Sequence, residues 1–198
     1  MAGSSNGSAK RIIILFMLAM IVVGGFAMLV NRNKSTDVTP TQITEVEDAL
    51  ARNLNTNYPE TPKELLKYYS QITKCFYSMD YTEEQLDELA VKSRELLDED
   101  LKAQQTDEEY LRDLKTSIDI FKSLDRTISS YSVSSAADIE YNKYEGSDWA
   151  KAYCIFTVRD GKKMVATQEE FLLRKSMDGH WKIFGWRIVE DDEETDNG

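Results

Sequence analysis

A long apolar run near the start of the chain constrains its fold most. Ile12–Val30 comprises nineteen residues without a charged or strongly polar side chain. A helix of this length spans roughly 28 Å, about one bilayer hydrocarbon core. A buried core helix would carry a polar stripe, and the hydrophobic region of a cleaved signal peptide is shorter and ends at a small-x-small site. We therefore predict an uncleaved transmembrane helix.

The basic residues around this helix barely favour one orientation. Lys10 and Arg11 precede it, and Arg32 and Lys34 follow it. The positive-inside rule is therefore almost balanced. A short basic-ended tail before a long C-terminal region is the usual layout of a signal anchor. We expect a single-pass protein of the cell membrane, with residues 1–11 in the cytoplasm and the C-terminal domain extracellular; a domain that faces the cytoplasm is the alternative.

The chain that follows the apolar run is strongly acidic. This part holds all 35 Asp and Glu residues and 22 of the 24 Lys and Arg residues, a net charge of −13. Nucleic acid is bound by clusters of Lys and Arg, so we expect no nucleic-acid partner. The charge also disfavours a domain lying flat on anionic lipid. A block of six acids in Glu190–Asp196 repels itself and predicts a disordered tail.

These features divide the chain into five segments. About 130 residues remain for folding, enough for one domain with its own core. A weak apolar stripe at Thr41–Leu54 predicts a stalk or docking helix before that domain. We expect a cytoplasmic tail at 1–11, a transmembrane helix at 12–30, a linker and stalk helix at 31–59, a soluble domain at 60–190 and a disordered acidic tail at 191–198.

A repeated helix-start signal, T-x-x-E/Q, precedes the apolar stripes. In such a capping box the Thr oxygen accepts from the third helical amide, and the Glu or Gln reaches back to the Thr amide. The predicted starts are Thr39, Thr61, Thr82 and Thr106. Apolar residues then recur at spacings of three and four, as on a helix with one buried face. The stripe after Thr82 runs on through Leu96 and Leu97 to Leu101, which predicts one continuous helix.

From Thr127 onward the apolar pattern changes to period two, which is typical of strands. The pairs Glu145-Gly146, Asp160-Gly161 and Asp178-Gly179 supply the positive φ angles of tight hairpins. Helices followed by such strands predict an α+β domain, with three to four helices on one face of a curved antiparallel sheet of about five strands. The predicted strands are 127–134, 139–144, 149–159, 162–175 and 181–189.

The order of elements and the closing motif carry a resemblance. Long strands that end in Asp178-Gly179-His180-Trp181-Lys182-Ile183-Phe184-Gly185-Trp186 resemble the nuclear transport factor two-like, or cystatin-like cone, fold. The segment from Tyr58-Pro59-Glu60-Thr61-Pro62 to Trp186, with its strand Arg126–Val133, is similar to an uncharacterised family of single-pass membrane proteins of Gram-positive bacteria. The resemblance implies the cone fold. It implies no catalytic residue, because that fold hosts isomerases, dehydratases, ligand binders and assembly domains.

Few residues in the chain point to chemistry. His180 is the single histidine and follows a turn, so we expect it in solvent. There is no Cys-x-x-Cys, no G-x-S-x-G elbow and no glycine left for a phosphate loop. We therefore predict no catalytic residue, no metal ligand and no cofactor. Cys75 and Cys154 are expected to be free and buried, with a disulfide between them as the alternative.

One candidate pocket and one candidate partner surface remain. Small residues on an inward strand face leave room for a cavity, although aromatic side chains that simply fill the space are the simpler alternative. The pattern predicts no polar residue on the apolar strand faces. Residues Trp181, Phe184 and Trp186 share the last strand, where alternation places at least one aromatic on the outer face unless Gly185 forms a bulge. The candidate pocket is lined by Tyr69, Phe76, Ala152, Cys154 and Phe156.

These observations support two hypotheses of different classes. The leading one is a membrane-anchored, extracytoplasmic, non-catalytic domain that binds an unknown protein partner or associates with itself. The alternative is a small-ligand-binding protein, or an enzyme of the lyase or isomerase type, that uses the cavity of the cone. A buried Asp, Glu or Tyr at the base of that cavity would favour the alternative. An interior filled by apolar side chains, with an apolar patch on the outer sheet face, would favour the first.

Overall fold

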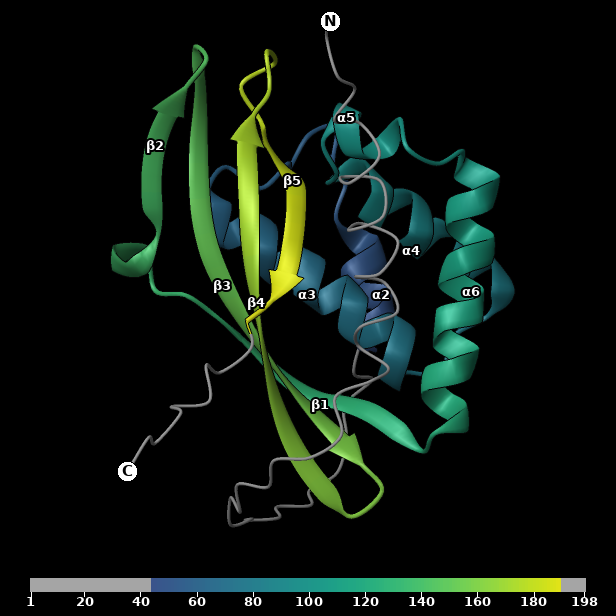
Figure 1. Cartoon of the computed structure of the whole chain (residues 1–198). Coiled ribbons are helices and arrows are strands. Elements are labelled where there is room, and N and C mark those ends of the chain that lie inside the picture. Colours follow the sequence, from purple (N-terminus) through teal and green to yellow (C-terminus); the bar gives the residue numbers. More distant parts are fainter. Residues whose placement is uncertain (1–43, 190–198) are drawn as a thin grey trace, which may run out of the picture.

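The computed structural model describes residues 44–189, which form an α+β domain (Figure 1). Among these residues, no helix combines the length and the apolar character needed to cross a bilayer. The membrane helix predicted at Ile12–Val30 lies outside the described residues, as do the predicted cytoplasmic tail and the acidic tail. The structure therefore bears on the domain and on the end of the linker that leads into it.

The sheet contains five antiparallel strands in the order β1-β3-β4-β5, with β2 also paired to β3. Because β3 is long, one of its edges holds two strands end to end: β1 along Cys154–Asp160 and β2 along Ser147–Lys151. The three predicted turn glycines have positive φ angles. The strands are β1 (Arg126–Val133), β2 (Glu140–Tyr144), β3 (Ser147–Asp160), β4 (Lys163–Lys175) and β5 (Trp181–Ile188), with a 3-10 helix η1 (Ala136–Asp138) before β2.

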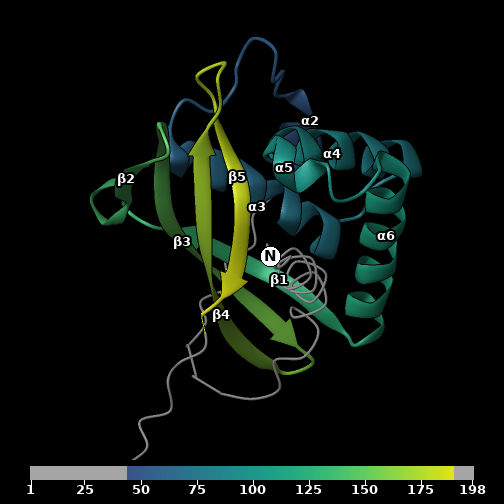
Figure 2. The same ribbon diagram turned by 45° about the horizontal axis from the view of Figure 1, so that its top comes forward.

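Residues 44–189 form five α-helices, more than the three to four predicted. They lie on one side of the sheet, as Figures 1 and 2 show. One buried face of α3 and of α6 packs toward the strands, as the predicted stripes require. The core includes the fully buried rings of Phe121, Phe156 and Phe171. The helices are α2 (Glu45–Ala51), α3 (Pro62–Ser78), α4 (Glu83–Glu95), α5 (Glu99–Lys102) and α6 (Asp107–Ser123).

Threonine caps define the helix starts. Thr82 and Thr106 form complete capping boxes with the residue three positions later, as predicted. Thr61 caps α3, but Glu64 reaches the amide of Glu60 instead of completing the box. The predicted start at Thr39 lies outside the described residues. Within them, α2 begins at a further capping box that is formed by Thr44 with Glu47.

Helix α2, predicted as a stalk or docking helix, packs against the rest of the domain. Val46 and Ala49 are buried in the main core. The hydroxyl of Tyr68 on α3 donates to the carbonyl of Ala49 at 2.8 Å. Lys74 forms an ion pair with Glu45 at 2.7 Å. These contacts make α2 a part of the folded unit, although its stripe is too short to reveal this.

The helix predicted to continue to Leu101 ends at Glu95, and this prediction was wrong. The backbone of the next residues pairs with strand β5 instead: the Ile183 amide donates to Leu96 at 2.9 Å, and the Asp98 amide donates to Ile183 at 2.8 Å. Leu96, in the turn that ends α4, and Leu97, in an isolated parallel bridge to Ile183, are both buried. Pairing with the free edge of β5 satisfies backbone groups that a helix would have satisfied internally.

An ion pair between buried Asp98 and partly exposed Arg174 ties this segment to the sheet. The carboxylate of Asp98 accepts from Nε of Arg174 on β4 at 2.9 Å and also from Nη2. The same carboxylate caps α5 by accepting from the Asp100 amide at 3.0 Å. Asp98 is buried, whereas Asp100, which also contacts Arg174, is exposed. Removing Asp98 would take away its two hydrogen bonds to Arg174 and would leave that guanidinium paired with the exposed Asp100.

We expect Asp98→Ala to lower the free energy of unfolding by about 2–4 kcal/mol, because it removes the buried partner of Arg174 and the cap of α5. The exposed neighbour provides a matched control, since Asp100→Ala should cost less than about 1 kcal/mol. Urea unfolding of the full chain, followed by tryptophan fluorescence, measures both values. Equal losses for the two variants would contradict a special role for Asp98.

Candidate functional site

The residues predicted to line a pocket all contribute to the inner face of the domain. Ala152, Cys154 and Phe156 on β3 are fully buried, and Phe76 on α3 is almost so. Tyr69 is partly exposed, and its ring lies against two aromatic rings of the strands. The structure thus brings the predicted set together in the interior, where the side chains pack against one another.

The two cysteines are free and buried, as expected. The Sγ atom of Cys154 lies 3.2 Å from the hydroxyl of Ser70. Burial raises the pKa of the Cys154 thiol to about 12 and that of the Cys75 thiol to about 11. Thiols with such values are protonated at neutral pH and are poor nucleophiles.

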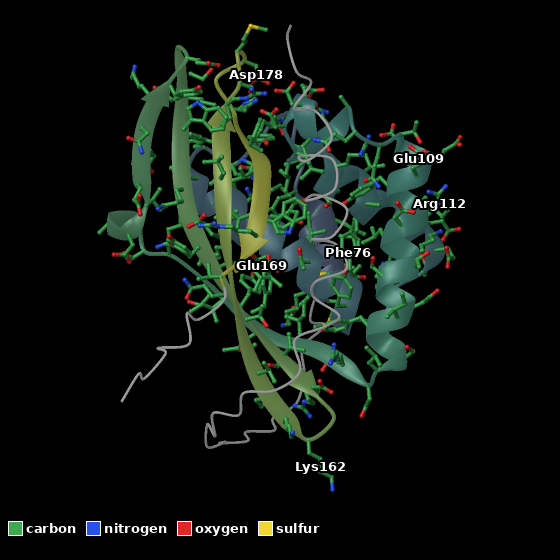
Figure 3. The ribbon with its side chains drawn as sticks, in the orientation of Figure 1. Phe76, Glu109, Arg112, Lys162, Glu169 and Asp178 are labelled. Carbon is green, nitrogen blue, oxygen red and sulfur yellow. The ribbon has the colours of Figure 1, made fainter. Side chains whose placement is uncertain are left out.

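Glu169 on β4 is the most unusual residue of the interior, and it is absent from the candidates predicted from the sequence (Figure 3). Its side chain points inward in the alternation of Val165, Phe171 and Leu173, and the residue is 2% exposed. The prediction that no polar residue lies on an apolar strand face was therefore wrong. The signal was present, because period two along β4 places Glu169 on the same face as its apolar neighbours.

The carboxyl group of Glu169 is held neutral by its surroundings. No hydrogen bond or ion pair to it is formed by other residues in the range 44–189, and burial raises its pKa from 4.5 to about 8. Burial, with Tyr110 and Glu169 nearby, also raises the pKa of Tyr69. A carboxylic acid that stays protonated at neutral pH can donate a hydrogen bond or a proton. The alternative hypothesis asks for a buried acid at the base of a cavity, and Glu169 supplies the acid.

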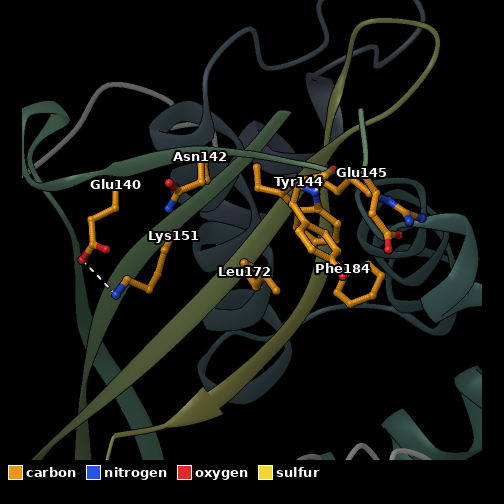
Figure 4. Close-up of a pocket in the computed structure, with 10 residues that line it drawn as sticks. Glu140, Asn142, Tyr144, Glu145, Lys151, Leu172 and Phe184 are labelled. Carbon is orange, nitrogen blue, oxygen red and sulfur yellow. Dashed lines mark hydrogen bonds and ion pairs between the residues drawn. The ribbon is translucent and has the colours of Figure 1, made fainter. Parts of the chain in front are cut away.

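The outer face of the sheet carries a second feature, which we call the outer-face pocket. It is an open pocket of about 480 Å³ between β2 and the outward side chains of β3, β4 and β5 (Figure 4). Apolar side chains form much of it: Tyr144 is 63% exposed and Leu172 is 38% exposed. Its lining residues are Glu140, Asn142, Tyr144, Glu145, Trp149, Ala150, Lys151, Leu172, Arg174 and Phe184.

Specific contacts fix the shape of the outer-face pocket. The rings of Trp149 and Phe184 meet edge to face with centroids 5.0 Å apart, and Nε1 of Trp149 donates to the carbonyl of Tyr144 at 3.2 Å. The guanidinium of Arg174 lies over both rings, 5.6 Å from Trp149 and 5.0 Å from Phe184. At the rim, Lys151 pairs with Glu140 at 2.9 Å. Aromatic and Arg side chains of this kind are enriched at protein interfaces.

The three aromatic residues proposed as a partner surface are divided between two faces. A register shift opposite Leu172 and Leu173 makes Phe184 an extra residue in β5. This bulge lets both tryptophans face inward: Trp181 is buried, and Trp186 stacks on Phe171. Phe184 alone points outward, into the outer-face pocket. The pocket's other aromatic residues, Tyr144 and Trp149, come from β2 and β3.

His180 and possible metal-binding groups are the remaining candidates for chemistry. The ring of His180 stacks on Tyr58 with centroids 4.2 Å apart, and its Nδ1 lies 3.1 Å from Asp178. In residues 44–189, no group of three or more His, Cys, Asp or Glu side chains is arranged to hold a metal ion. The structure thus offers a neutral buried acid inside the sheet and an aromatic pocket outside it.

Comparisons with known proteins add one finding. A family model described as a domain of unknown function, DUF6715, matches residues 1–186 of the chain. The matched range covers the apolar run, the linker and nearly all of the folded domain. The search of curated proteins found no match.

We expect the stability of the domain to fall as pH rises from about 5 to about 8 because of Glu169. Its pKa is about 8 in the folded chain and 4.5 ordinarily, so over this range only the unfolded state releases the proton. Below both pKa values, Glu169 is protonated in the folded and in the unfolded state. Its burial then no longer makes the free energy of unfolding depend on pH. Glu169→Gln should remove this slope and raise the free energy of unfolding near pH 8 by about 4 kcal/mol.

Urea unfolding of the full chain across this pH range measures the slope. Glu170→Gln serves as the control, because Glu170 is the next residue and pairs on the outer face with Arg187 at 2.8 Å. It should leave the slope of the parent chain in place. A parent chain and a Glu169→Gln variant with parallel pH profiles would show that Glu169 ionises normally.

Proposed function

The chain belongs to the DUF6715 family, and we propose that it is a membrane-anchored, non-catalytic module that binds a partner protein through the outer face of its sheet. The observation that carries this proposal is the aromatic pocket on that face, which no element of residues 44–189 covers. The outward face of an antiparallel sheet with helices on its other side is normally polar. Here Tyr144, Leu172 and Ile155 are exposed on it.

The shape of the outer-face pocket suits a protein partner. Trp149, Phe184 and Arg174 are already ordered against one another, so little side-chain freedom is lost when a partner binds. Charged pairs such as Lys151 with Glu140 surround the apolar centre and supply a polar rim. An apolar centre with a polar rim is the usual anatomy of a protein interface, and the partner would insert an apolar side chain beside Leu172.

The sequence supports the rest of the proposal. Ile12–Val30 would anchor the chain, with its N-terminus in the cytoplasm and the acidic domain outside the cell. The α+β arrangement of helices on one antiparallel sheet is compatible with the cone fold that the closing motif resembles. The resemblance to single-pass proteins of Gram-positive bacteria motivates the proposed anchor. The net charge of −13 after the anchor would keep the domain away from anionic lipid and nucleic acid.

A specific observation also favours the second function. Glu169 is a buried acid that burial holds neutral near pH 7, beside the partly exposed ring of Tyr69. If the interior opens to a small molecule, this carboxyl group would donate a hydrogen bond to it or act as a general acid. The chain would then be a ligand-binding protein or an enzyme of the lyase or isomerase type.

Site-specific crosslinking in intact cells tests the leading proposal. We expect a photoreactive residue in place of Leu172 to capture one protein reproducibly, because Leu172 lies in the outer-face pocket. The same residue in place of Val91, which is exposed on α4, should capture none. Phe184→Ser should abolish the capture at Leu172 by removing the ring that shapes the pocket.

Two results would distinguish partner binding through the outer-face pocket from the binding of a small ligand. Equal capture from both positions would show that the pocket has no special role. If no protein is captured, and native mass spectrometry finds a metabolite on the parent chain but none on Glu169→Gln, the ligand-binding function replaces the leading proposal.

The proposed topology predicts the behaviour of reporter fusions after Gly198. A reporter that is active only outside the cytoplasm should work there, because the single anchor would place the whole domain outside. A matched fusion of a reporter that works only in the cytoplasm should be silent. Activity of the cytoplasmic reporter after Gly198 would reverse the proposed orientation, and activity assays of both fusions in intact cells decide between the two.

A further inference from the structure

Strand β2 leaves one edge of the sheet open. Among the described residues it pairs only with β3, and Figures 1 and 2 show it at the margin of the sheet. All five of its residues, Glu140–Tyr144, are exposed. An unpaired strand edge presents N–H and C=O groups that can hydrogen-bond to a further strand.

The hairpin geometry identifies which backbone groups are open. Glu145 and Gly146 form a two-residue turn with φ angles of 48° and 79°, as in a type I′ hairpin. The pair that closes such a hairpin, Tyr144 with Ser147, is hydrogen-bonded, and the pairs then alternate along the strand. The N–H and C=O groups of Tyr141 and Lys143 therefore point away from β3. No hydrogen bond to them occurs within residues 44–189.

We propose that β2 pairs with the β2 strand of a second copy of this chain, antiparallel and centred on Asn142. In this register Tyr141 lies opposite Lys143 of the second copy, and the same pair repeats across the two-fold axis. The two pairs use all the open N–H and C=O groups of both residues and form four hydrogen bonds. This inference goes beyond the docking of a partner in the outer-face pocket and does not depend on it.

The side chains of β2 are complementary to themselves in this register. Lys143 meets the ring of Tyr141, which is 55% exposed and available for a cation–π contact. Glu140 lies opposite Tyr144, and Asn142 lies opposite its own copy, where two amides can hydrogen-bond. No two like charges face each other. The nearby charge of Asp148, 3.3 Å from Lys143, offsets the two lysines that approach the axis.

Neighbouring registers are poorer. A shift of two residues in one direction places Lys143 opposite Lys143 of the second copy, and directly opposed like charges are destabilising. A shift in the other direction pairs Lys143 with Ile139, which precedes the strand and is buried. The register centred on Asn142 is therefore the one in which both open residues find suitable partners.

The interface would be weak and sensitive to salt. Five residues of paired strand bury less area than a stable dimer needs, roughly 1,200 Å² or more. Each copy also carries a net charge of −11, so the copies repel each other at long range. Salt screens that repulsion, and the dimer should become stronger as ionic strength rises.

A proline substitution tests the open amide directly. Lys143→Pro removes an N–H that points away from β3, so pairing within the sheet is kept. We expect the dissociation constant of the dimer to rise about thirtyfold, because two backbone hydrogen bonds are lost across the interface. Lys143→Ala is the matched control, because it keeps the amide and loses only the cation over Tyr141. Its dimer should therefore be weaker than that of the parent chain but tighter than that of Lys143→Pro. Sedimentation velocity of the full chains in detergent gives these constants.

A cysteine at the two-fold axis provides an independent test. Non-hydrogen-bonded opposite residues have Cα atoms about 4.5 Å apart, within reach of a disulfide, so Asn142→Cys should form a disulfide-linked dimer under mild oxidation. Tyr141→Cys should not, because its copy lies diagonally about 7–8 Å away. The native thiols of Cys75 and Cys154 are buried. Oxidation of the parent chain measures any crosslinking that they cause.

Some outcomes would overturn the proposal. A monomeric parent chain at high concentration and high salt would do so, as would a dimer that Lys143→Pro leaves unchanged. Equal crosslinking of Asn142→Cys and Tyr141→Cys would show that the register is wrong. Each of these results leaves the docking of a partner at Leu172 intact, and a failure of that docking leaves the pairing of β2 intact.

Discussion

The long pairing of β3 with β4 organises the rest of the domain. It runs without a register shift from Trp149 opposite Arg174 to Asp160 opposite Lys163. Because side chains alternate along a strand, this unbroken register assigns every residue of both strands to one of two faces. The length of β3 also gives β1 and β2 a shared edge, and the regular register keeps the helices on one face and the outer-face pocket on the other.

The same constraint explains why a carboxyl group is buried. Glu169 lies between Val165 and Phe171 in the inward alternation of β4, and it cannot turn outward unless the strand slips by one residue. Such a slip would expose the whole apolar face of β4. The domain therefore tolerates a neutral acid in its interior, which costs stability near neutral pH. A cost of this kind is common where a residue serves a function, which is why the ligand-binding function stays beside the leading proposal.

Two surfaces would serve association in different ways. The outer-face pocket is preorganised by contacts among Trp149, Phe184 and Arg174, and it suits an inserted apolar side chain. The edge of β2 offers backbone groups in a register that matches itself. Both surfaces include residues of β2, and the outer-face pocket also includes outward side chains of β3, β4 and β5. One chain could therefore use both at once, since pairing at the edge leaves Leu172 on the sheet face.

The sequence by itself determined the local features. Threonine caps at Thr82 and Thr106 and glycine turns such as Asp160-Gly161 depend on residues within three or four positions, so the helix starts and hairpins could be predicted. Period two in the strands likewise predicted the α+β class. The same alternation along β4 also places Glu169 on the inward face.

Only the tertiary structure decided features that join distant segments. Leu96 and Leu97 fit a helical stripe, but the helix ends in a turn at Leu96, and Leu97 forms an isolated bridge to Ile183 at the edge of β5. The bulge at Phe184 turned both tryptophans inward, and α2 was held by a hydrogen bond from Tyr68. Each of these results depends on which backbone groups remain unpaired after the sheet has formed. Local patterns do not contain that information, because the partners are far apart in the chain.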